Sequence, residues 1–250
     1  MKEWIWGRNP VFETLRAGRR QFYELRIAQG IQANERVDEV LKLAKAAKLP
    51  ITQVPRDTLN VFSDHHQGIA LQVNAYPYAT ITDILNAAKR KAEPLLVLLL
   101  DTLKDPQNLG TLIRTSEAVG VHGIVLPLRR TATVTPAVVS ASSGASEHSL
   151  ITQANLAQTL DQLKKEGVWV IGLEGGSEAK PPDQVDLSGP LAVVVGSEAE
   201  GMRQLVKSSC DFLMKLPMGG LVDSLNAAVA GSVALYLIWQ ARDYLGARKY

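Results

Sequence analysis

The sequence predicts an α/β protein in which a small front unit precedes a larger domain built on a parallel sheet. Two observations lead to this prediction. Across residues 91–250, short continuous apolar runs alternate with helical stretches, which is typical of a parallel sheet covered by helices on both faces. Residues 1–75 follow a different pattern, and a stretch containing Pro and Tyr after them marks the start of a linker.

The front unit is predicted to hold helices and short strands in alternation. Asn9 and Pro10 supply a cap and a proline at the first helical position, and Gly18 marks the end of that helix. Apolar residues at helical spacing predict an amphipathic helix over residues 34–47. The predicted strands are residues 22–28, 51–54 and 69–73.

The larger domain is predicted to contain buried strands at residues 95–100, 123–126, 168–173, 191–195 and 212–216. In parallel sheets of this kind, ligands bind at the carboxyl ends of the strands. A functional site is therefore expected in the loops that follow Leu100, Leu173, Val195 and Leu216.

The composition excludes several classes of protein. Of the 250 residues, 46% are apolar and 21% are charged, as in globular proteins and unlike disordered or collagen-like chains. The single cysteine, Cys210, cannot build a disulfide framework, and the four histidines lack the HExxH spacing, so no metal is expected. The charged start and the shortness of the longest aliphatic run, residues 95–100, predict a cytoplasmic protein without a signal peptide or membrane span.

The charge is distributed unevenly along the chain. The net charge is +2, but residues 1–75 carry eleven Lys and Arg against eight Asp and Glu. A mildly basic front half is compatible with an RNA partner.

Two of the expected loops contain residues suited to chemistry. The first carries Asn108 and, on the first turns of the following helix, Arg114. Taken alone, Arg114 is typical of a solvated arginine and Asn108 of a helix cap. The loop after Val195 places Gly196 and Gly201 around an acidic turn, which fits either an ordinary strand–helix turn or close approach of a ligand to the backbone. It matches neither GxGxxG nor a P-loop, so nucleoside triphosphate chemistry has no support.

The last loop leads into the final helix. Ser224 is placed to cap this helix, and Asn226 falls in its first turn. Small residues follow at positions 227, 228 and 230–232. They predict close packing, either inside the domain or against another subunit.

In this order and spacing, the motifs resemble those of one family. The three segments are Asn108-x-Gly110-x-x-x-Arg114, Gly196-Ser197-Glu198-x-x-Gly201, and Leu216-Pro217-Met218 with Ser224-Leu225-Asn226. They are similar to the three motifs of the SpoU, or TrmH-like, family of S-adenosylmethionine-dependent RNA ribose 2′-O-methyltransferases. The resemblance spans residues 95–240 and departs at Ala199, where many members have glycine.

The front half is similar to the same family. Residues 7–11 (Gly-Arg-Asn-Pro-Val) and 66–70 (His-Gln-Gly-Ile-Ala) resemble the substrate-binding domain of the RlmB-type subgroup, which methylates a guanosine of large-subunit (23S) ribosomal RNA. The resemblance implies an L30e-like RNA-binding domain at residues 1–75 and a linker with the first helix at 76–92. It also implies a SPOUT-type methyltransferase domain with a deep trefoil knot at residues 93–250.

The resemblance implies that S-adenosylmethionine is the cofactor and binds in the knot, mostly through backbone groups. An apolar slot with a few backbone hydrogen bonds suits an adenine ring. Matched position by position, the motifs place the cofactor pocket at Leu173, Gly196, Gly201, Leu216, Met218 and Leu225.

The family's motif arginine corresponds to Arg114, which is expected to act on the ribose hydroxyl. That hydroxyl is a poor nucleophile until it is deprotonated or strongly hydrogen-bonded. A guanidinium normally stays protonated, so Arg114 acts either as a base in an unusual environment or by positioning the phosphate and stabilising the developing alkoxide. Residues expected to hold Arg114 and the ribose in place are Asn108, Glu198, Ser224 and Asn226.

The expected partners are RNA and a second copy of the chain. Arg8, Arg19 and Arg20 lie near the first predicted helix, where phosphate contacts would position the substrate, and His65 and His66 are expected to be structural. The family implies a homodimer through the knotted domain and ribosomal RNA, or a ribosome precursor, as the substrate.

Three alternative functions stay open. One is methylation of transfer RNA or of another ribosomal site, although the simplest transfer-RNA enzymes of the family lack a front domain. The second is a non-catalytic RNA-binding or ribosome-assembly protein on the same fold, which a methyl-transfer assay would distinguish. The third is a small-molecule α/β enzyme, which the basic two-domain layout does not favour.

Overall fold

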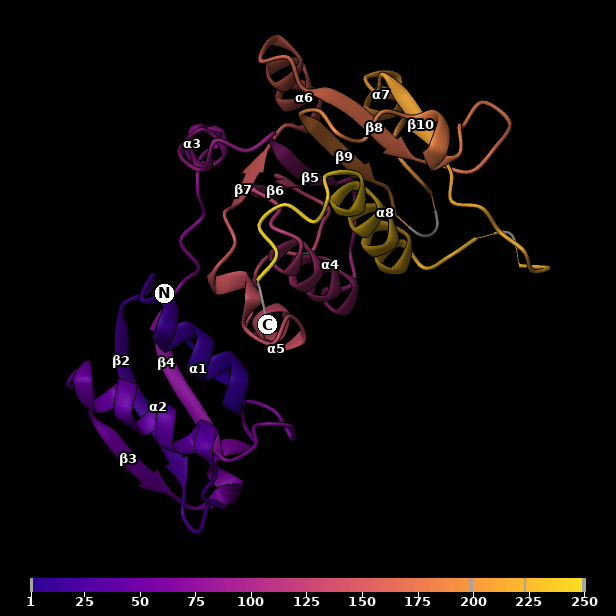
Figure 1. Cartoon of the computed structure of the whole chain (residues 1–250). Coiled ribbons are helices and arrows are strands. Elements are labelled where there is room, and N and C mark those ends of the chain that lie inside the picture. The colour runs from indigo at the N-terminus through magenta and orange to yellow at the C-terminus, as the bar shows by residue number, and fades with distance from the viewer. Residues whose placement is uncertain (1, 198–199, 223, 249–250) are drawn as a thin grey trace. The chain divides into compact units, whose positions relative to one another are not determined.

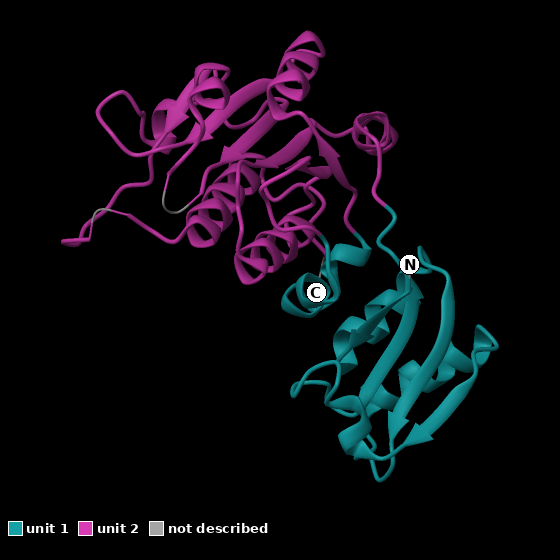
Figure 2. Cartoon of the chain, turned by 180° about the vertical axis from the view of Figure 1, so that it is seen from behind, with its two compact units in different colours: residues 1–77, 134–148 teal, residues 78–133, 149–250 magenta. Residues whose placement is uncertain are grey.

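The computed structural model of the chain describes residues 2–197, 200–222 and 224–248. Its contacts divide it into two compact units (Figure 2): unit 1 comprises residues 1–77 and 134–148, and unit 2 comprises residues 78–133 and 149–250. Residues 134–148, predicted to belong to the sheet domain, therefore group with the front unit. None of the helices in the described residues has the length and apolarity that crossing a bilayer requires.

Unit 1 is a four-stranded sheet with helices (Figure 1). Its first stretch holds β1 (Lys2–Trp6), α1 (Arg8–Ala17), β2 (Phe22–Ala28), α2 (Glu35–Ala46), β3 (Ile51–Val54), the short 3-10 helix η1 (Arg56–Leu59) and β4 (Ile69–Asn74). Its second stretch adds α5 (Pro136–Ala141) and the 3-10 helix η2 (Ala145–Glu147). The strand order is β1-β4-β2-β3, with β2 and β3 parallel and the other pairs antiparallel.

The elements of unit 1 follow the predicted pattern with two differences. The strands at residues 22–28 and 51–54 and the helix over residues 34–47 are confirmed, but β1 was not predicted. The start of α1 was predicted wrongly, because its N-cap is Gly7, with φ of 93°, and not Asn9. Only glycine adopts such a backbone conformation readily, so the chain turns from β1 directly into α1 at this residue.

Unit 2 is built on a six-stranded, fully parallel sheet in the order β10-β8-β9-β5-β6-β7. The strands are β5 (Leu96–Leu100), β6 (Gly123–Pro127), β7 (Ile151–Ala154), β8 (Trp169–Leu173), β9 (Leu191–Val195) and β10 (Phe212–Met214). The helices are α3 (Ile81–Lys91), α4 (Pro106–Ala118), α6 (Leu156–Lys165), α7 (Gln204–Ser208) and α8 (Ala227–Ala241), with a 3-10 helix η3 (Pro182–Gln184). The α/β fold with a parallel sheet is thereby confirmed.

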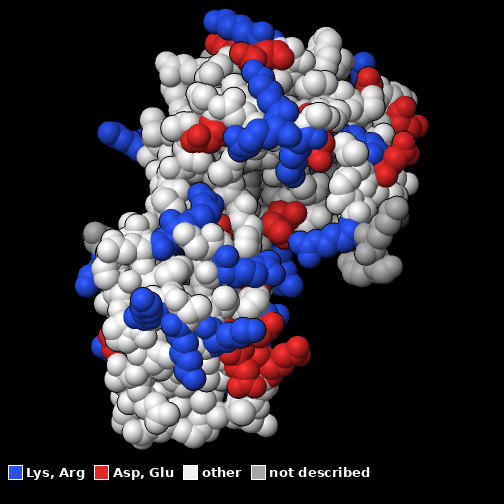
Figure 3. Space-filling view, turned by 60° about the vertical axis from the view of Figure 1, so that its left-hand side comes forward, with Lys and Arg blue, Asp and Glu red and all other residues white. Residues whose placement is uncertain are grey.

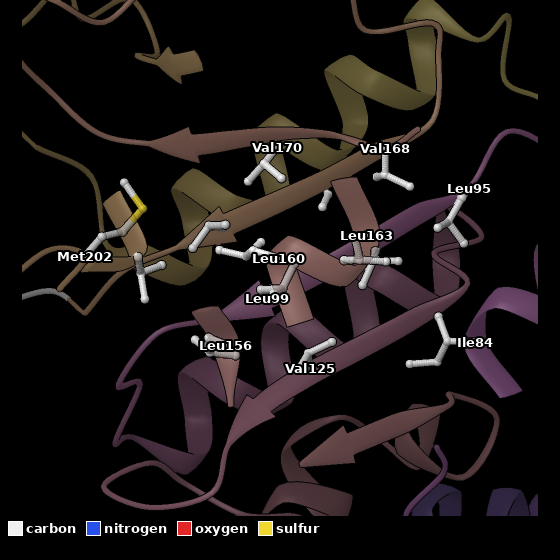
Figure 4. Packing of buried hydrophobic residues seen from close by; sticks show 14 of the residues in the cluster. Ile84, Leu95, Leu99, Val125, Leu156, Leu160, Leu163, Val168, Val170 and Met202 are labelled. Carbon is white, nitrogen blue, oxygen red and sulfur yellow. The ribbon is translucent and has the colours of Figure 1, made fainter. Parts of the chain in front are cut away.

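Helices cover both faces of this sheet. On one face α3, α6 and α7 pack against the strands, and Figure 4 shows Leu160 and Leu163 of α6 lying over Leu99 and Val125. On the other face lie α4 and α8, where Gly231 of α8 packs against Val195 of β9. Because both faces are covered, the central strands β5 and β9 are buried at every position, which explains their continuous apolar runs.

The final helix packs inside unit 2 through its small residues. A Cβ atom at Gly231 would lie 2.6 Å from Leu112 Cδ2 of α4, so the Leu112 side chain would have to shift if this glycine were replaced. Ala227 and Ala228 are buried on the same helix. The predicted cap is wrong: Asn226, not Ser224, is the N-cap, and its side chain accepts hydrogen bonds from Ala228 N and Val229 N.

Candidate active site

A cavity of about 280 Å³ lies at the carboxyl ends of β8, β9 and β10. The loops that follow these strands line it together with the start of α8, as predicted for a parallel sheet. The structure brings all six predicted cofactor residues and Ser224 to this one cavity: Leu173, Gly196, Gly201, Leu216, Met218, Ser224 and Leu225. Lining residues that sequence reasoning missed are Glu174, Gly175, Val195, Ser197, Met214, Lys215, Ala227 and Ala230.

The loop after β9 is a tight turn that closes on itself. Ser197 and Gly201 exchange two backbone hydrogen bonds of 3.0 Å, and Gly201 has a φ of 65°. A Cβ atom at Gly196 would lie 2.3 Å from the carbonyl carbon of Gly201, so the strand end and the turn meet backbone to backbone. Glu198, a predicted catalytic residue, lies outside the described residues.

A buried carboxylate holds the exit of this loop. Asp101, at the end of β5, is fully buried and accepts hydrogen bonds of 2.8 Å from both the backbone N and the Nε of Arg203. Its own backbone N donates to Val195 O. The ends of β5 and β9 and the start of α7 are thus fixed to one another. Sequence reasoning missed this pair, because the two residues lie 102 positions apart.

The first and third motifs meet through a side-chain hydrogen bond. Asn226 Nδ2 donates to Asn108 Oδ1 at 3.1 Å, which joins the start of α8 to the first turn of α4. The N-cap of α4 is Asp105, so Asn108 is available for this contact. Asn108 and Asn226 therefore stand beside the cavity that Ser224 and Leu225 line.

Arg114 lies on α4, the helix that was predicted after the first of the expected loops. It occupies the third turn of this helix, and the residue is exposed. It is not among the residues that line the cavity. A guanidinium placed outside the cavity is suited to act on a polyanionic substrate that approaches from solvent.

A charged side chain, Glu174, also lines the cavity and can take part in ligand recognition. Glu174 follows β8 and forms an ion pair of 3.0 Å with Lys207 of α7. Its carboxylate would lie 3.6 Å from a Cβ at Gly201, which places it against the glycine turn. A carboxylate in this position can accept hydrogen bonds from the hydroxyl or ammonium groups of a ligand.

Two of the three arginines predicted to bind RNA have structural contacts in unit 1. Arg8 donates to the backbone carbonyls of Gln67 and Gln32 and so joins two loops. Arg19 is half-buried and donates to the carbonyls of Glu147 and Pro77. For both residues, an RNA contact stays a prediction.

The prediction for Arg20 is corrected by the structure. Its side chain is fully buried and forms ion pairs with Glu147, at 2.7 Å, and with Glu3, at 3.1 Å. A guanidinium enclosed by two carboxylates has no face left for a phosphate. Figure 3 shows groups of Lys and Arg side chains on the visible face, together with Asp and Glu side chains.

The expectation that His66 is structural fits its contacts. It is buried, its Nδ1 accepts a hydrogen bond of 2.8 Å from Gly68 N, and its Nε2 lies 3.1 Å from Asn60 Oδ1. Burial, with a smaller contribution from Arg56, lowers the pKa of His66. The neutral ring therefore fixes the turn that leads into β4.

A larger cavity of about 460 Å³ lies at the opposite edge of the sheet, beside Glu93, His122 and Arg242. Here Arg242 donates to the carbonyls of Pro94 and Gly189 and ties the end of α8 to the strands. None of the motif residues lines this cavity. In the described part of the chain, no group of three or more His, Cys, Asp or Glu side chains is arranged to hold a metal ion.

Comparison with known proteins agrees with this site. The profile described as the SpoU rRNA Methylase family matches residues 95–236, and that of RNA 2′-O ribose methyltransferase substrate binding matches residues 4–79. A Bacillus subtilis (strain 168) protein, YacO, whose name assigns it to the TrmH family of tRNA/rRNA methyltransferases, is 43% identical over 98% of each chain. A Staphylococcus aureus (strain COL) protein of the same family is 41% identical over 97% of each chain.

A solved structure shares the fold of the whole chain. The SpoU methyltransferase AviRb from Streptomyces viridochromogenes, determined in complex with the cofactor AdoMet, superposes with a TM-score of 0.80. The alignment covers 97% of this chain and 91% of AviRb, at 20% sequence identity. With the matched profiles and relatives, this shows that the chain belongs to the SpoU family of RNA methyltransferases and carries the family's substrate-binding unit at its front.

Proposed function

We propose that the chain transfers a methyl group from S-adenosylmethionine to the ribose 2′-hydroxyl of a guanosine in 23S ribosomal RNA. The observation that carries this proposal is that residues of the second and third motifs line one cavity, and that the Asn226–Asn108 hydrogen bond joins the first motif to the third. AviRb, which shares the fold, binds the same cofactor.

The residues around the cavity fit S-adenosylmethionine. Leu173, Leu216 and Leu225 offer apolar surface for an adenine ring, and Gly196 and Gly201 line the cavity without side chains. The Glu174 carboxylate suits the ribose hydroxyls or the ammonium group of the cofactor. When bound, this cofactor supplies a methyl group on a positively charged sulfur.

The polar residues next to the cavity account for the handling of RNA. In the proposal, Asn108 and Asn226 orient the ribose. Ser224 lines the cavity, and its hydroxyl helps to hold the ribose in place. Arg114 holds the phosphate of the target nucleotide and stabilises negative charge that develops on the 2′-oxygen. Positioning of this kind supplies several kcal/mol of barrier lowering, on the order of 7–11 kcal/mol at most.

We favour ribosomal RNA as the substrate because the chain has a substrate-binding unit at its front, which the simplest transfer-RNA enzymes of the family lack. The name of the relative YacO covers both tRNA and rRNA, so transfer RNA is the second candidate. The test is methyl transfer from labelled S-adenosylmethionine to unmodified 23S rRNA and, separately, to unmodified bulk tRNA. Mapping of 2′-O-methyl sites in RNA from a strain lacking the gene then identifies the nucleotide. Methylation of tRNA alone would overturn the ribosomal assignment.

The same proposal includes a homodimer that forms through unit 2. It also includes a knot in the C-terminal segment of that unit. The residues Val229, Val233 and Tyr236 form one stripe of α8, and between 40% and 47% of each is exposed. Exposed apolar stripes of this kind are typical of an interface. Sedimentation should show a dimer for the chain and a monomer for Val233→Glu, whereas a wild-type monomer would contradict this part of the proposal.

A further inference from the structure

The loop that follows β6 carries two adjacent exposed arginines, Arg129 and Arg130. Neither forms a hydrogen bond or an ion pair with any other residue that the structure describes. This sets them apart from Arg8, Arg19 and Arg20 of unit 1, whose guanidinium groups bind carbonyls or carboxylates. Two neighbouring cations without a protein counterion attract a polyanion.

The backbone at Arg130 is unusual. Its φ is 60°, in the left-handed region that glycine adopts most easily and that a long side chain disfavours. The turn alone would be satisfied better by glycine.

The loop is fixed to the site rather than loosely attached. Ala132 N and Thr131 Oγ1 both donate to Leu103 O, at 2.7 and 2.8 Å. Leu103 is buried and belongs to the segment that leads from β5 into α4, the helix of Asn108 and Arg114. Because β5 and β6 are neighbouring parallel strands, both loops leave the sheet at the same edge.

We infer that Arg129 and Arg130 form a phosphate-binding surface of unit 2 that holds the RNA backbone next to the target nucleotide. This inference rests on the proposed function and adds to it a substrate contact outside the front unit. The two guanidinium groups contact phosphates and read no base, so they set affinity and position rather than sequence preference.

The test compares two double variants that remove the same charge from opposite edges of the sheet. R129Q/R130Q removes the proposed surface, and K89Q/R90Q removes two exposed charges from the end of α3, which precedes the amino end of β5. The probe is unmodified 23S rRNA, titrated at a series of salt concentrations, with bulk tRNA as a second probe. Cofactor affinity and melting temperature are measured for each protein.

For R129Q/R130Q, the slope of log affinity against log salt should fall by about 1.4–1.8, because two phosphate contacts are lost. KM for RNA should rise while kcat, cofactor affinity and melting temperature stay at wild-type values. K89Q/R90Q should keep the wild-type slope. Equal slopes for all three proteins, or equal losses in both variants, would overturn the inference.

The two proposals fail in distinguishable ways. If the wild-type protein binds RNA and R129Q/R130Q lowers the salt slope as expected, but no methyl group is transferred to either RNA, the proposed function is overturned. The phosphate-binding surface then still stands. A wild-type protein that binds neither RNA overturns both. Methyl transfer with an unchanged slope in R129Q/R130Q overturns the surface alone.

Discussion

Arg114 is the residue on which the proposed chemistry depends most. It is exposed on α4 and does not line the cavity, so its removal should spare both folding and the cofactor. Arg114→Ala should lower kcat by about a hundredfold to a thousandfold, the usual cost of one charge-stabilising group. Arg114→Lys keeps the charge but loses the planar fork, and should recover only part of the rate. Single-turnover methyl transfer and calorimetric cofactor titration measure the two effects, and near wild-type turnover of Arg114→Ala would remove the residue from the mechanism.

Gly196 tests the backbone of the cofactor loop. A Cβ there would lie 2.3 Å from the carbonyl carbon of Gly201, so even Gly196→Ala should displace the turn. Strain of this kind costs about 1–3 kcal/mol, so cofactor affinity should fall roughly tenfold to a hundredfold for Gly196→Val. The matched control is Gly175→Ala, which lines the same cavity but has no atom within 4 Å of the added Cβ. Unchanged calorimetric affinity in a folded Gly196→Val variant would contradict the role of this turn.

His66 makes the stability of unit 1 depend on pH. Burial lowers the pKa of His66 in the folded chain, so between that value and the ordinary value of about 6.5 the unfolded chain binds more protons. Its contribution to stability is therefore fully present above pH 6.5 and is lost as the pH falls through the lowered pKa. A proton on Nδ1 would break the hydrogen bond from Gly68 N. Proton NMR should give a pKa for His66 below 6.5, with faster exchange of the Gly68 amide at acidic pH, and a value above 6.5 would contradict this prediction.

At the scale of elements, the start of α8 combines two roles in one residue. Asn226 caps the helix by accepting from Ala228 N and Val229 N, and it also donates to Asn108. Asn226→Asp keeps the acceptor for the cap but, as a carboxylate, cannot donate to Asn108 Oδ1. It should hold its melting temperature and lose methyl transfer, whereas Asn226→Ala should lose both, with a stability cost of about 1 kcal/mol. Full activity in Asn226→Asp would show that the bond between the motifs is not used.

The same elements show what the sequence could and could not predict. The central strands β5 and β9 were predictable because burial on both faces leaves a continuous apolar signal. Strand β7 was missed because it is short, at the sheet edge, and reads Ile-Thr-Gln-Ala. The cap at Asn226 was misplaced by two residues because Ser224 is an equally good capping residue type, and only the hydrogen bonds from Ala228 N and Val229 N identify Asn226 as the cap.

In the site as well, residues that belong to a sequence motif could be predicted, whereas residues that are placed only by tertiary contacts could not. The six cofactor residues came from the family motifs and lie on one cavity, although their role in binding stays a prediction. The Asp101–Arg203 pair and the arginines of the loop after β6 carry no motif signal. Their positions follow from the sheet order, which pairs β5 with both β9 and β6 and which periodicity alone cannot supply.

At the scale of the whole molecule, unit 1 is assembled from two distant stretches of the chain. Residues 134–148 join it through the buried pair of Arg20 and Glu147, which are 127 positions apart. Tyr76 donates to Ser146 O at 2.9 Å, and burial raises the pKa of Tyr76 to about 12, so its hydroxyl stays neutral. The sequence pattern assigns residues 134–148 to the neighbouring sheet domain, because no local sequence feature indicates that they pack into unit 1.

The pair at the centre of unit 1 gives the last prediction. Arg20→Met leaves Glu147 buried without its partner, and such a break typically costs about 3–5 kcal/mol. The double variant Arg20→Met, Glu147→Met replaces both charges with apolar groups of similar length and should recover most of that loss. Hydrogen exchange followed by mass spectrometry should show the change in unit 1, over β1, β4 and residues 134–148, while the strands of unit 2 and calorimetric cofactor affinity stay at wild-type values. If the double variant is as unstable as Arg20→Met, then the ion pair itself, and not the burial around it, holds residues 134–148 in unit 1.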